Sequence, residues 1–149
     1  WPTLHDAAVA HAIMGPPERG ARMIRGIGVD CVSITETGRL LRELGDTFTN
    51  YTFTEAEVRA GKDTARPEDH FAVRFAVKEA VYKAVAHLTP DKHFDLRIVE
   101  TLLRQDGTPY VNVSQSLQEQ LTLAAVGSLH LTVSREQDRA LAFVIATDT

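Results

Sequence analysis

The sequence predicts an α+β fold in a single domain, and three observations lead to this prediction. Helix and strand patterns are mixed along the chain without regular alternation, which favours α+β architecture. One predicted helix, from Pro67 to about Leu88, is long and apolar on two sides, so we expect it at the centre, packed against antiparallel strands. The length of 149 residues suits one ordinary domain and leaves little chain for a second.

The first strand pattern leads to an aspartate. Apolar residues punctuated by glycines predict a buried strand in which the glycines allow a bend or a close backbone approach: Ile24, Gly26, Ile27, Gly28 and Val29. Asp30 stands at the end of this strand. Such a carboxylate is often delivered to a functional site, although Asp30 taken alone could equally cap the helix that follows.

Two capping patterns predict short helices before the long one. Ser33 and Glu36 have the spacing of a capping box, and Thr54 and Glu57 repeat it. Each predicted helix stops at or near a glycine: Gly45 for the first and Gly61 for the second.

The C-terminal half is expected to supply the antiparallel strands. Phe94, Leu96 and Ile98 alternate as in a strand, Asp106-Gly107 is a turn signal, and residues 110–113 return as its partner. Further elements are a helix over 117–126 stopped by Gly127, then strands over 129–134 and 141–145.

Residues 1–22 differ in character from the rest, because residues 15–20 read as a helix breaker and linker. We interpret them as an N-terminal extension, a linker from a larger polypeptide or an expression remnant, with the domain over 23–149.

The net charge of −4 argues against nucleic acid and anionic membranes as partners. No apolar run approaches a membrane span. The single Cys31 fits a cytoplasmic location and a small buried role.

Charged residues on the long helix are the informative anomaly. Arg74, Lys78, Glu79 and Lys83 lie on an element whose two apolar faces leave little room for free solvation. The plain interpretation is that Glu79 pairs with Lys83 one turn away and that Arg74 neighbours Lys78 on an amphipathic helix. The functional interpretation is that these charges, together with Asp30, form a site.

Three segments in order resemble the holo-acyl-carrier-protein synthase family of 4'-phosphopantetheinyl transferases. They are Gly-Ile-Gly-Val-Asp at 26–30, Arg-Phe-Ala-Val-Lys-Glu-Ala-Val-Tyr-Lys at 74–83, and His-Leu-Thr-Val-Ser at 130–134. Weaker matches lie at 53–57 and 107–110, and the resemblance extends from about Met23 to Ile145.

The resemblance implies an enzyme that transfers 4'-phosphopantetheine from coenzyme A to a serine of an apo acyl carrier protein and releases 3',5'-ADP. It implies Mg²⁺, with Mn²⁺ as a substitute, on Asp30 and Glu79, since Mg²⁺ prefers carboxylate, phosphate and water oxygens. Glu79 is also implied as the base, and Lys83 as the group that stabilises or protonates the leaving oxygen.

Coenzyme A contacts are implied for five residues: Arg74, Lys78, Lys83, His130 and Ser134. A plainer reading keeps Arg74 structural and His130 a hydrogen-bonded core histidine. Short members of the family are typically homotrimers with shared active sites, and their carriers serve fatty-acid or polyketide synthesis. We therefore expect a homotrimer with coenzyme A and an acyl carrier protein as its other partners.

Several positions depart from the family pattern. Ser33 replaces a common glutamate, residues 86–90 replace a glycine-rich turn, and Arg135 replaces a second histidine. The helix after Asp30, usually basic, mixes Arg39 and Arg42 with acids. Two alternatives stay open: a noncatalytic coenzyme A-binding or assembly domain of a larger fatty-acid or polyketide synthase, and an unrelated metal-dependent phosphoryl-transfer enzyme.

Overall fold

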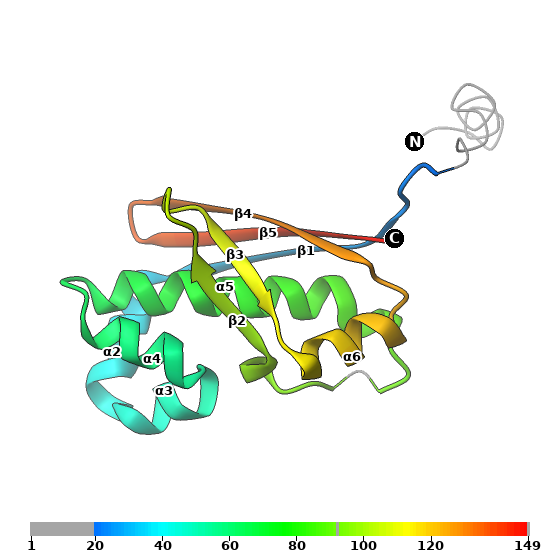
Figure 1. Ribbon diagram of the computed structural model, residues 1–149. Coiled ribbons are helices and arrows are strands. Elements are labelled where there is room, and N and C mark those ends of the chain that lie inside the picture. The colour runs from blue at the N-terminus through cyan, green and yellow to red at the C-terminus, as the bar shows by residue number, and fades with distance from the viewer. Residues whose placement is uncertain (1–19, 92, 149) are drawn as a thin grey trace, which may run out of the picture.

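The computed structural model describes residues 20–91 and 93–148, so the predicted extension lies almost wholly outside the described residues (Figure 1). Its elements, in chain order, are β1 (Ile24–Ser33), α2 (Ile34–Leu44), α3 (Asp46–Thr52), α4 (Glu55–Lys62), α5 (Pro67–Val85), η1 (Ala86–Leu88), η2 (Leu96–Ile98), β2 (Val99–Leu103), β3 (Pro109–Val113), α6 (Gln115–Leu123), β4 (Ser128–Glu136) and β5 (Arg139–Thr147).

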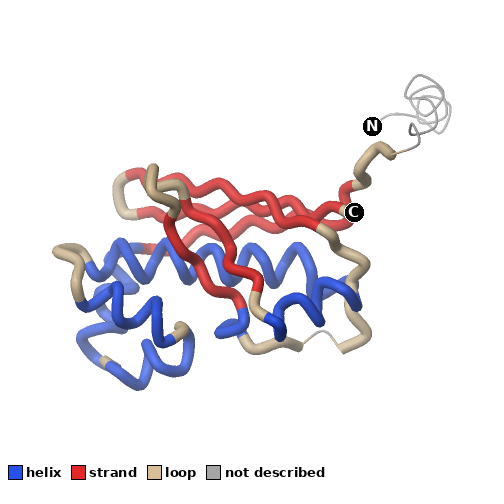
Figure 2. Tube along the Cα trace, in the orientation of Figure 1, coloured by secondary structure: helices blue, strands red, loops and turns tan. Residues whose placement is uncertain are grey.

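The strands form two antiparallel sheets. One has three strands in the order β1-β5-β4, and the other is the hairpin β2-β3. Helix α5 runs along one face of the three-stranded sheet, and the described helices all lie on that side of it (Figures 1 and 2). The predicted α+β architecture, with a long helix against antiparallel strands, is confirmed.

Helix α5 is buried on two sides, as its two apolar stripes predict. The buried residues that it contributes to the main core cluster are Ala76, Val77, Ala80, Val81, Ala84 and Val85. This cluster also includes Ala142, Val144 and Ala146 of β5 on one side and Val99, Leu117 and Leu121 on the other. The helix is therefore sandwiched between the three-stranded sheet and the β2–β3 and α6 layer.

Strand β1 packs against α5 through its glycines rather than its apolar side chains. A Cβ atom built on Gly26 would lie 1.9 Å from the carbonyl oxygen of Ala84, and one on Gly28 would lie 1.8 Å from that of Ala80. The predicted close backbone approach is confirmed. The predicted burial of the apolar residues is wrong, because strand alternation turns Ile27 and Val29 outward, where they are 54% and 47% exposed.

Local sequence signals placed most helix ends correctly. Ser33 caps α2 by accepting a hydrogen bond from the Glu36 amide, and Gly45 is its C-cap. Thr54 and Glu57 form the predicted capping box of α4. Helix α3 was not predicted, because it has only seven residues and no capping side chain.

Several boundaries differ from prediction, and two of the differences have a clear local cause. The alternation over residues 94–98 forms the short turn η2, because the Asp95 side chain accepts a hydrogen bond from the Arg97 amide and favours a turn over an extended chain. Helix α6 ends before Gly127, because Ala125 takes the left-handed conformation at φ 53° and the Val126 amide bonds to the Leu121 carbonyl. Among the described residues, no helix is long and apolar enough to cross a membrane.

Candidate active site

Asp30 is a residue of β1, and its side chain lies at the interface with α5. It shares the helix-facing side of the strand with Gly26 and Gly28, and its carboxylate Oδ1 lies 2.8 Å from the ammonium Nζ of Lys83. The same ammonium group donates to the carbonyl oxygen of Val29 at 3.1 Å. Strand β1 continues to Ser33, so Asp30 lies within the strand and not at its end as predicted. It does not cap α2, since Ser33 does.

Glu79 faces the same interface from α5, one turn before Lys83. Burial raises the pKa of its carboxyl group, the negative charge of Asp30 raises that pKa further, and the positive charge of Lys83 opposes both. The two carboxylates are therefore close enough to repel each other. Lys83 forms its ion pair with Asp30, across the strand-helix interface, instead of the predicted pair within the helix.

This donor set fits a magnesium ion shared with a phosphate substrate. The described residues hold no group of three or more His, Cys, Asp and Glu side chains that could bind a metal without help. Two carboxylates with water and phosphate oxygens are, however, a common coordination for Mg²⁺. A cation here would also relieve the repulsion between Asp30 and Glu79.

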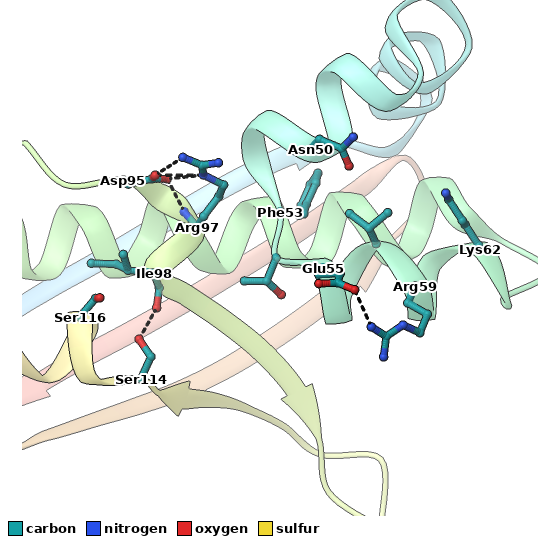
Figure 3. Close-up of a pocket in the computed structure, with 12 residues that line it drawn as sticks. Asn50, Phe53, Glu55, Arg59, Lys62, Asp95, Arg97, Ile98, Ser114 and Ser116 are labelled. Atoms are coloured by element: carbon teal, nitrogen blue, oxygen red, sulfur yellow. Dashed lines mark hydrogen bonds and ion pairs between the residues drawn. The ribbon is translucent and has the colours of Figure 1, made fainter.

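An apolar cavity of about 580 Å³ opens beside Glu79. Aromatic rings supply much of its lining: Phe48, Tyr51, Phe75 and Phe94. It shares Asp95 and Arg97 with a second cavity of about 760 Å³ between α4 and the start of α6 (Figure 3). The Arg97 guanidinium donates three hydrogen bonds to the Asp95 carboxylate, and this ion pair lines both cavities. The sequence did not indicate the aromatic cavity beside Glu79, since two of its rings, Phe48 and Tyr51, belong to α3, which was not predicted.

Lys78 lies inside the protein. Its side chain is 0% exposed, and its ammonium group lies 2.8 Å from the Glu57 carboxylate, whose side chain is also 0% exposed. The expected contact between Lys78 and a phosphate is therefore not available in this conformation. The sequence indicated Glu57, the buried partner of Lys78, only as a capping residue of α4.

Arg74 lies one turn before Lys78 and is also buried, at 7% exposure. One of its terminal nitrogens donates to the His70 carbonyl oxygen at 3.2 Å, and burial lowers the pKa of its guanidinium, opposed by the charge of Glu57. It lines a third cavity of about 590 Å³, together with Arg66 and Arg135. Glu79 is not among the residues that line this cavity.

His130 and Ser134 lie on the opposite face of the sheet from Asp30. Val133 is paired with Ala142, which is buried against α5, so the residues next to Val133 along β4 face away from the helix. We call this side of the three-stranded sheet the outer face; it carries Ile27, Val29, Cys31, His130, Thr132, Ser134, Leu141, Phe143 and Ile145. Cys31 is exposed there, so its predicted buried role is wrong. Within one chain, the predicted site residues are split between two faces.

A family model described as "4'-phosphopantetheinyl transferase superfamily" matches residues 26–144. The chain belongs to this superfamily.

Relatives and solved structures agree with this membership. This phosphopantetheinyl transferase is 34% identical over 125 residues to the holo-[acyl-carrier-protein] synthase of Thermodesulfovibrio yellowstonii, which covers 84% of this chain and 100% of the relative. It superposes on the holo-[acyl-carrier-protein] synthase of Neisseria meningitidis with a TM-score of 0.74 at 31% identity, over 83% of this chain and 98% of the other. The Bacillus anthracis synthase, solved in complex with CoA (3',5'-ADP), gives 0.66 at 26% identity, over 87% and 100%. The family predicted from the sequence is confirmed.

Helix α2 of this transferase, which follows the strand that carries Asp30, has paired charges on its surface. Arg39 forms ion pairs with both Glu36 and Glu43 on its own helix. The mixture of acids and bases noted in the sequence is therefore a connected cluster on the surface. An acidic partner would have to compete with these two glutamates for the arginine.

Proposed function

We propose that the chain is a holo-acyl-carrier-protein synthase, which transfers 4'-phosphopantetheine from coenzyme A to a serine of an apo acyl carrier protein and releases 3',5'-ADP. The observation that carries this proposal is the meeting of Asp30 with Glu79 and Lys83 across the β1–α5 interface. A carboxylate pair beside a partly exposed lysine suits the transfer of a group that is rich in phosphate charge.

Asp30 and Glu79 would hold Mg²⁺, or Mn²⁺ in its place. The ion would neutralise charge on the pyrophosphate of coenzyme A as the bond to the leaving phosphate breaks. The support for this assignment is that both carboxylates face the same interface: burial raises the pKa of Glu79, and the negative charge of Asp30 raises it further.

Glu79 would also take the proton of the carrier serine, directly or through water. As that proton leaves, the serine oxygen forms a bond to the β-phosphorus, and the bond from this phosphorus to the bridging oxygen breaks. The electron pair departs on 3',5'-ADP. Lys83 would stabilise or protonate the departing oxygen. A carboxylate with a raised pKa is the better base near neutral pH, which supports this role for Glu79.

Self-association through the outer face would complete the coenzyme A site. Ile27 and Val29 leave apolar surface exposed on that face, and His130 and Ser134 lie on it. We propose a homotrimer in which these two residues contact the nucleotide held by a neighbouring copy. Arg74, which lines the separate cavity, would contribute a further phosphate contact. Lys78 is buried, so it would support the coenzyme A site from within the core through the residues that it contacts.

The carrier would belong to fatty-acid or polyketide synthesis, and the reaction would take place in the cytoplasm, which the lone cysteine fits. Residues 1–22 would be an extension to the domain over 23–149.

A noncatalytic coenzyme A-binding or assembly domain is the second candidate, favoured by the neutralised cluster of Arg39 on α2. The experiment that separates the two mixes the protein, Mg²⁺, coenzyme A and a panel of apo carriers, and follows carrier mass and 3',5'-ADP. The proposed function requires a metal-dependent mass increase of a carrier. Coenzyme A binding without any modified carrier would favour the second candidate, and nucleotide turnover without a carrier would favour an unrelated phosphoryl-transfer enzyme.

A further inference from the structure

Lys78 and Glu57 form an ion pair with no solvent contact. Both side chains are 0% exposed, and the nitrogen-oxygen distance is 2.8 Å. Desolvating two charges is costly, and their attraction offsets that cost only when other hydrogen bonds satisfy the remaining atoms. This pair has such bonds, and they lead to the wall of the cavity beside Glu79.

The partners of the pair are backbone groups of residues 96–101 and of Thr54, the N-cap of α4. The Lys78 ammonium donates to the carbonyl oxygens of Leu96, at 3.2 Å, and of Val99. The Glu57 carboxylate accepts from the Thr101 amide at 2.8 Å and, on its other oxygen, from the Thr54 amide at 2.9 Å. One ion pair thus connects α4, α5 and the segment that leads into β2.

These hydrogen bonds satisfy backbone groups of β2 along the edge that no described strand covers. Among the described strands, β2 pairs only with β3, so its other edge has no neighbouring strand from this part of the chain. The Val99 carbonyl and the Thr101 amide, two residues apart, point to the same edge of a strand. Lys78 and Glu57 therefore take the place of a neighbouring strand, with one donor and one acceptor.

The segment held in this way forms a wall of the proposed reaction site. Leu96, next to Asp95 and Arg97, lines the cavity that contains Glu79, and its carbonyl is one of the groups bound by Lys78 (Figure 3 shows Asp95 and Arg97).

We propose that Lys78 and Glu57 are positioning residues that fix the wall at residues 94–99 relative to Glu79, and so set the affinity for the pantetheine arm. This inference rests on the proposed function. The arm of coenzyme A, attached to the phosphate that reacts beside Glu79, would lie along the apolar lining formed by Phe75, Phe94 and Leu96. Without the pair, the wall would lose its anchor while Asp30, Glu79 and Lys83 remained in place.

The test compares Lys78→Met with a matched control, Ile34→Ala, which opens a cavity in the separate core cluster of Ile34, Ala72 and Ala140, to which no residue of the wall belongs. Both variants should unfold at lower temperature than the unmodified protein. For Lys78→Met we expect KM for coenzyme A to rise about tenfold with kcat within about threefold, and the amides of residues 94–101 to exchange hydrogen faster. For Ile34→Ala we expect KM and these amides to stay unchanged. The tenfold change corresponds to about 1.4 kcal/mol of binding.

Glu57→Gln keeps the size of the side chain and provides a second variant if Lys78→Met does not fold; we expect a smaller rise in KM in the same direction. An unchanged KM and unchanged exchange over 94–101 in either folded variant would overturn the proposal, as would an equal rise in Ile34→Ala. If the unmodified protein transfers nothing, the proposed function fails instead, and hydrogen exchange still shows whether the pair holds the wall.

Discussion

The ammonium group of Lys83 lies 2.8 Å from the carboxylate of Asp30, although 53 positions of the chain separate the two residues. Their meeting depends on the backbone of β1 lying directly against α5, where glycines leave room for the carbonyl oxygens of the helix. The site therefore depends on Gly26 and Gly28, because their lack of a side chain allows this close approach.

Replacing Gly28 with alanine should separate the two halves of the site. The new Cβ would lie 1.8 Å from the Ala80 carbonyl oxygen, so β1 must move away from α5. We expect stability to fall by about 3 kcal/mol in chemical denaturation, and transfer activity to be lost with it. Gly38→Ala is the matched control, because its Cβ would lie 3.2 Å from the flexible end of Arg42 and 3.4 Å from the Cβ of Glu68, without a backbone clash, and alanine favours the helix. Equal behaviour of the two variants would contradict the close-approach account.

Glu79→Gln should remove activity with little effect on folding. The amide is a poorer metal ligand and no base, so we expect kcat to fall by at least about 100-fold. Calorimetric titration with Mg²⁺ in the presence of coenzyme A should show weaker metal binding. Glu55→Gln, on exposed α4, serves as the control and should keep full activity. Full transfer by Glu79→Gln would refute the role of this carboxylate.

Removing divalent metal should stop the reaction reversibly. We expect a chelator to abolish carrier modification, and added Mg²⁺ or Mn²⁺ to restore it, because the two carboxylates alone leave the pyrophosphate charge uncompensated. Asp30→Asn should require a higher Mg²⁺ concentration for half-maximal rate. Carrier modification that persists in the chelator would exclude the metal mechanism.

Stability should decrease in mild acid because of His70. Burial, with the nearby charge of Arg74, lowers the pKa of this imidazole to about 4, while its ring nitrogen Nε2 donates to the Glu57 carbonyl oxygen at 2.8 Å. Since the unfolded chain takes up the proton near pH 6.5, stability should be lost as the pH falls from there towards 4. Allowing for partial exposure, we expect a loss of about 1 kcal/mol between about pH 7 and about pH 5. In His70→Gln, urea denaturation should show a smaller loss; an identical loss would assign the pH dependence to other groups.

A charge on the outer face should break up the proposed homotrimer. Val29 is exposed on the single chain, and we expect Val29→Lys to yield a folded monomer by light scattering, with reduced affinity for coenzyme A, because His130 of a second copy would be lost from the site. Leu103→Lys, at an equally exposed apolar position on β2, should leave assembly unchanged. A monomeric unmodified protein with full activity would exclude the shared site.

Features that depend on neighbouring residues were readable in the sequence. The N-cap of α2, the capping box of α4, the Asp106-Gly107 turn and the two apolar stripes of α5 appear as predicted, because their hydrogen bonds and periodicity form within a few residues. The capping box predicted for α2 is only half formed: Ser33 caps the helix, while the Glu36 carboxylate pairs with Arg39. The motif segments likewise identified the family.

The partners of the charged residues, by contrast, were settled by packing between distant elements. Lys83 pairs with Asp30 and Lys78 with Glu57, although each lysine has closer neighbours in the sequence. The same holds for β1, whose alternation is compatible with either face turned inward; the close approach of the α5 backbone selects the glycine face and turns Ile27 and Val29 outward. Such choices minimise clashes and unpaired buried groups across the whole fold, and no short stretch of sequence contains that information.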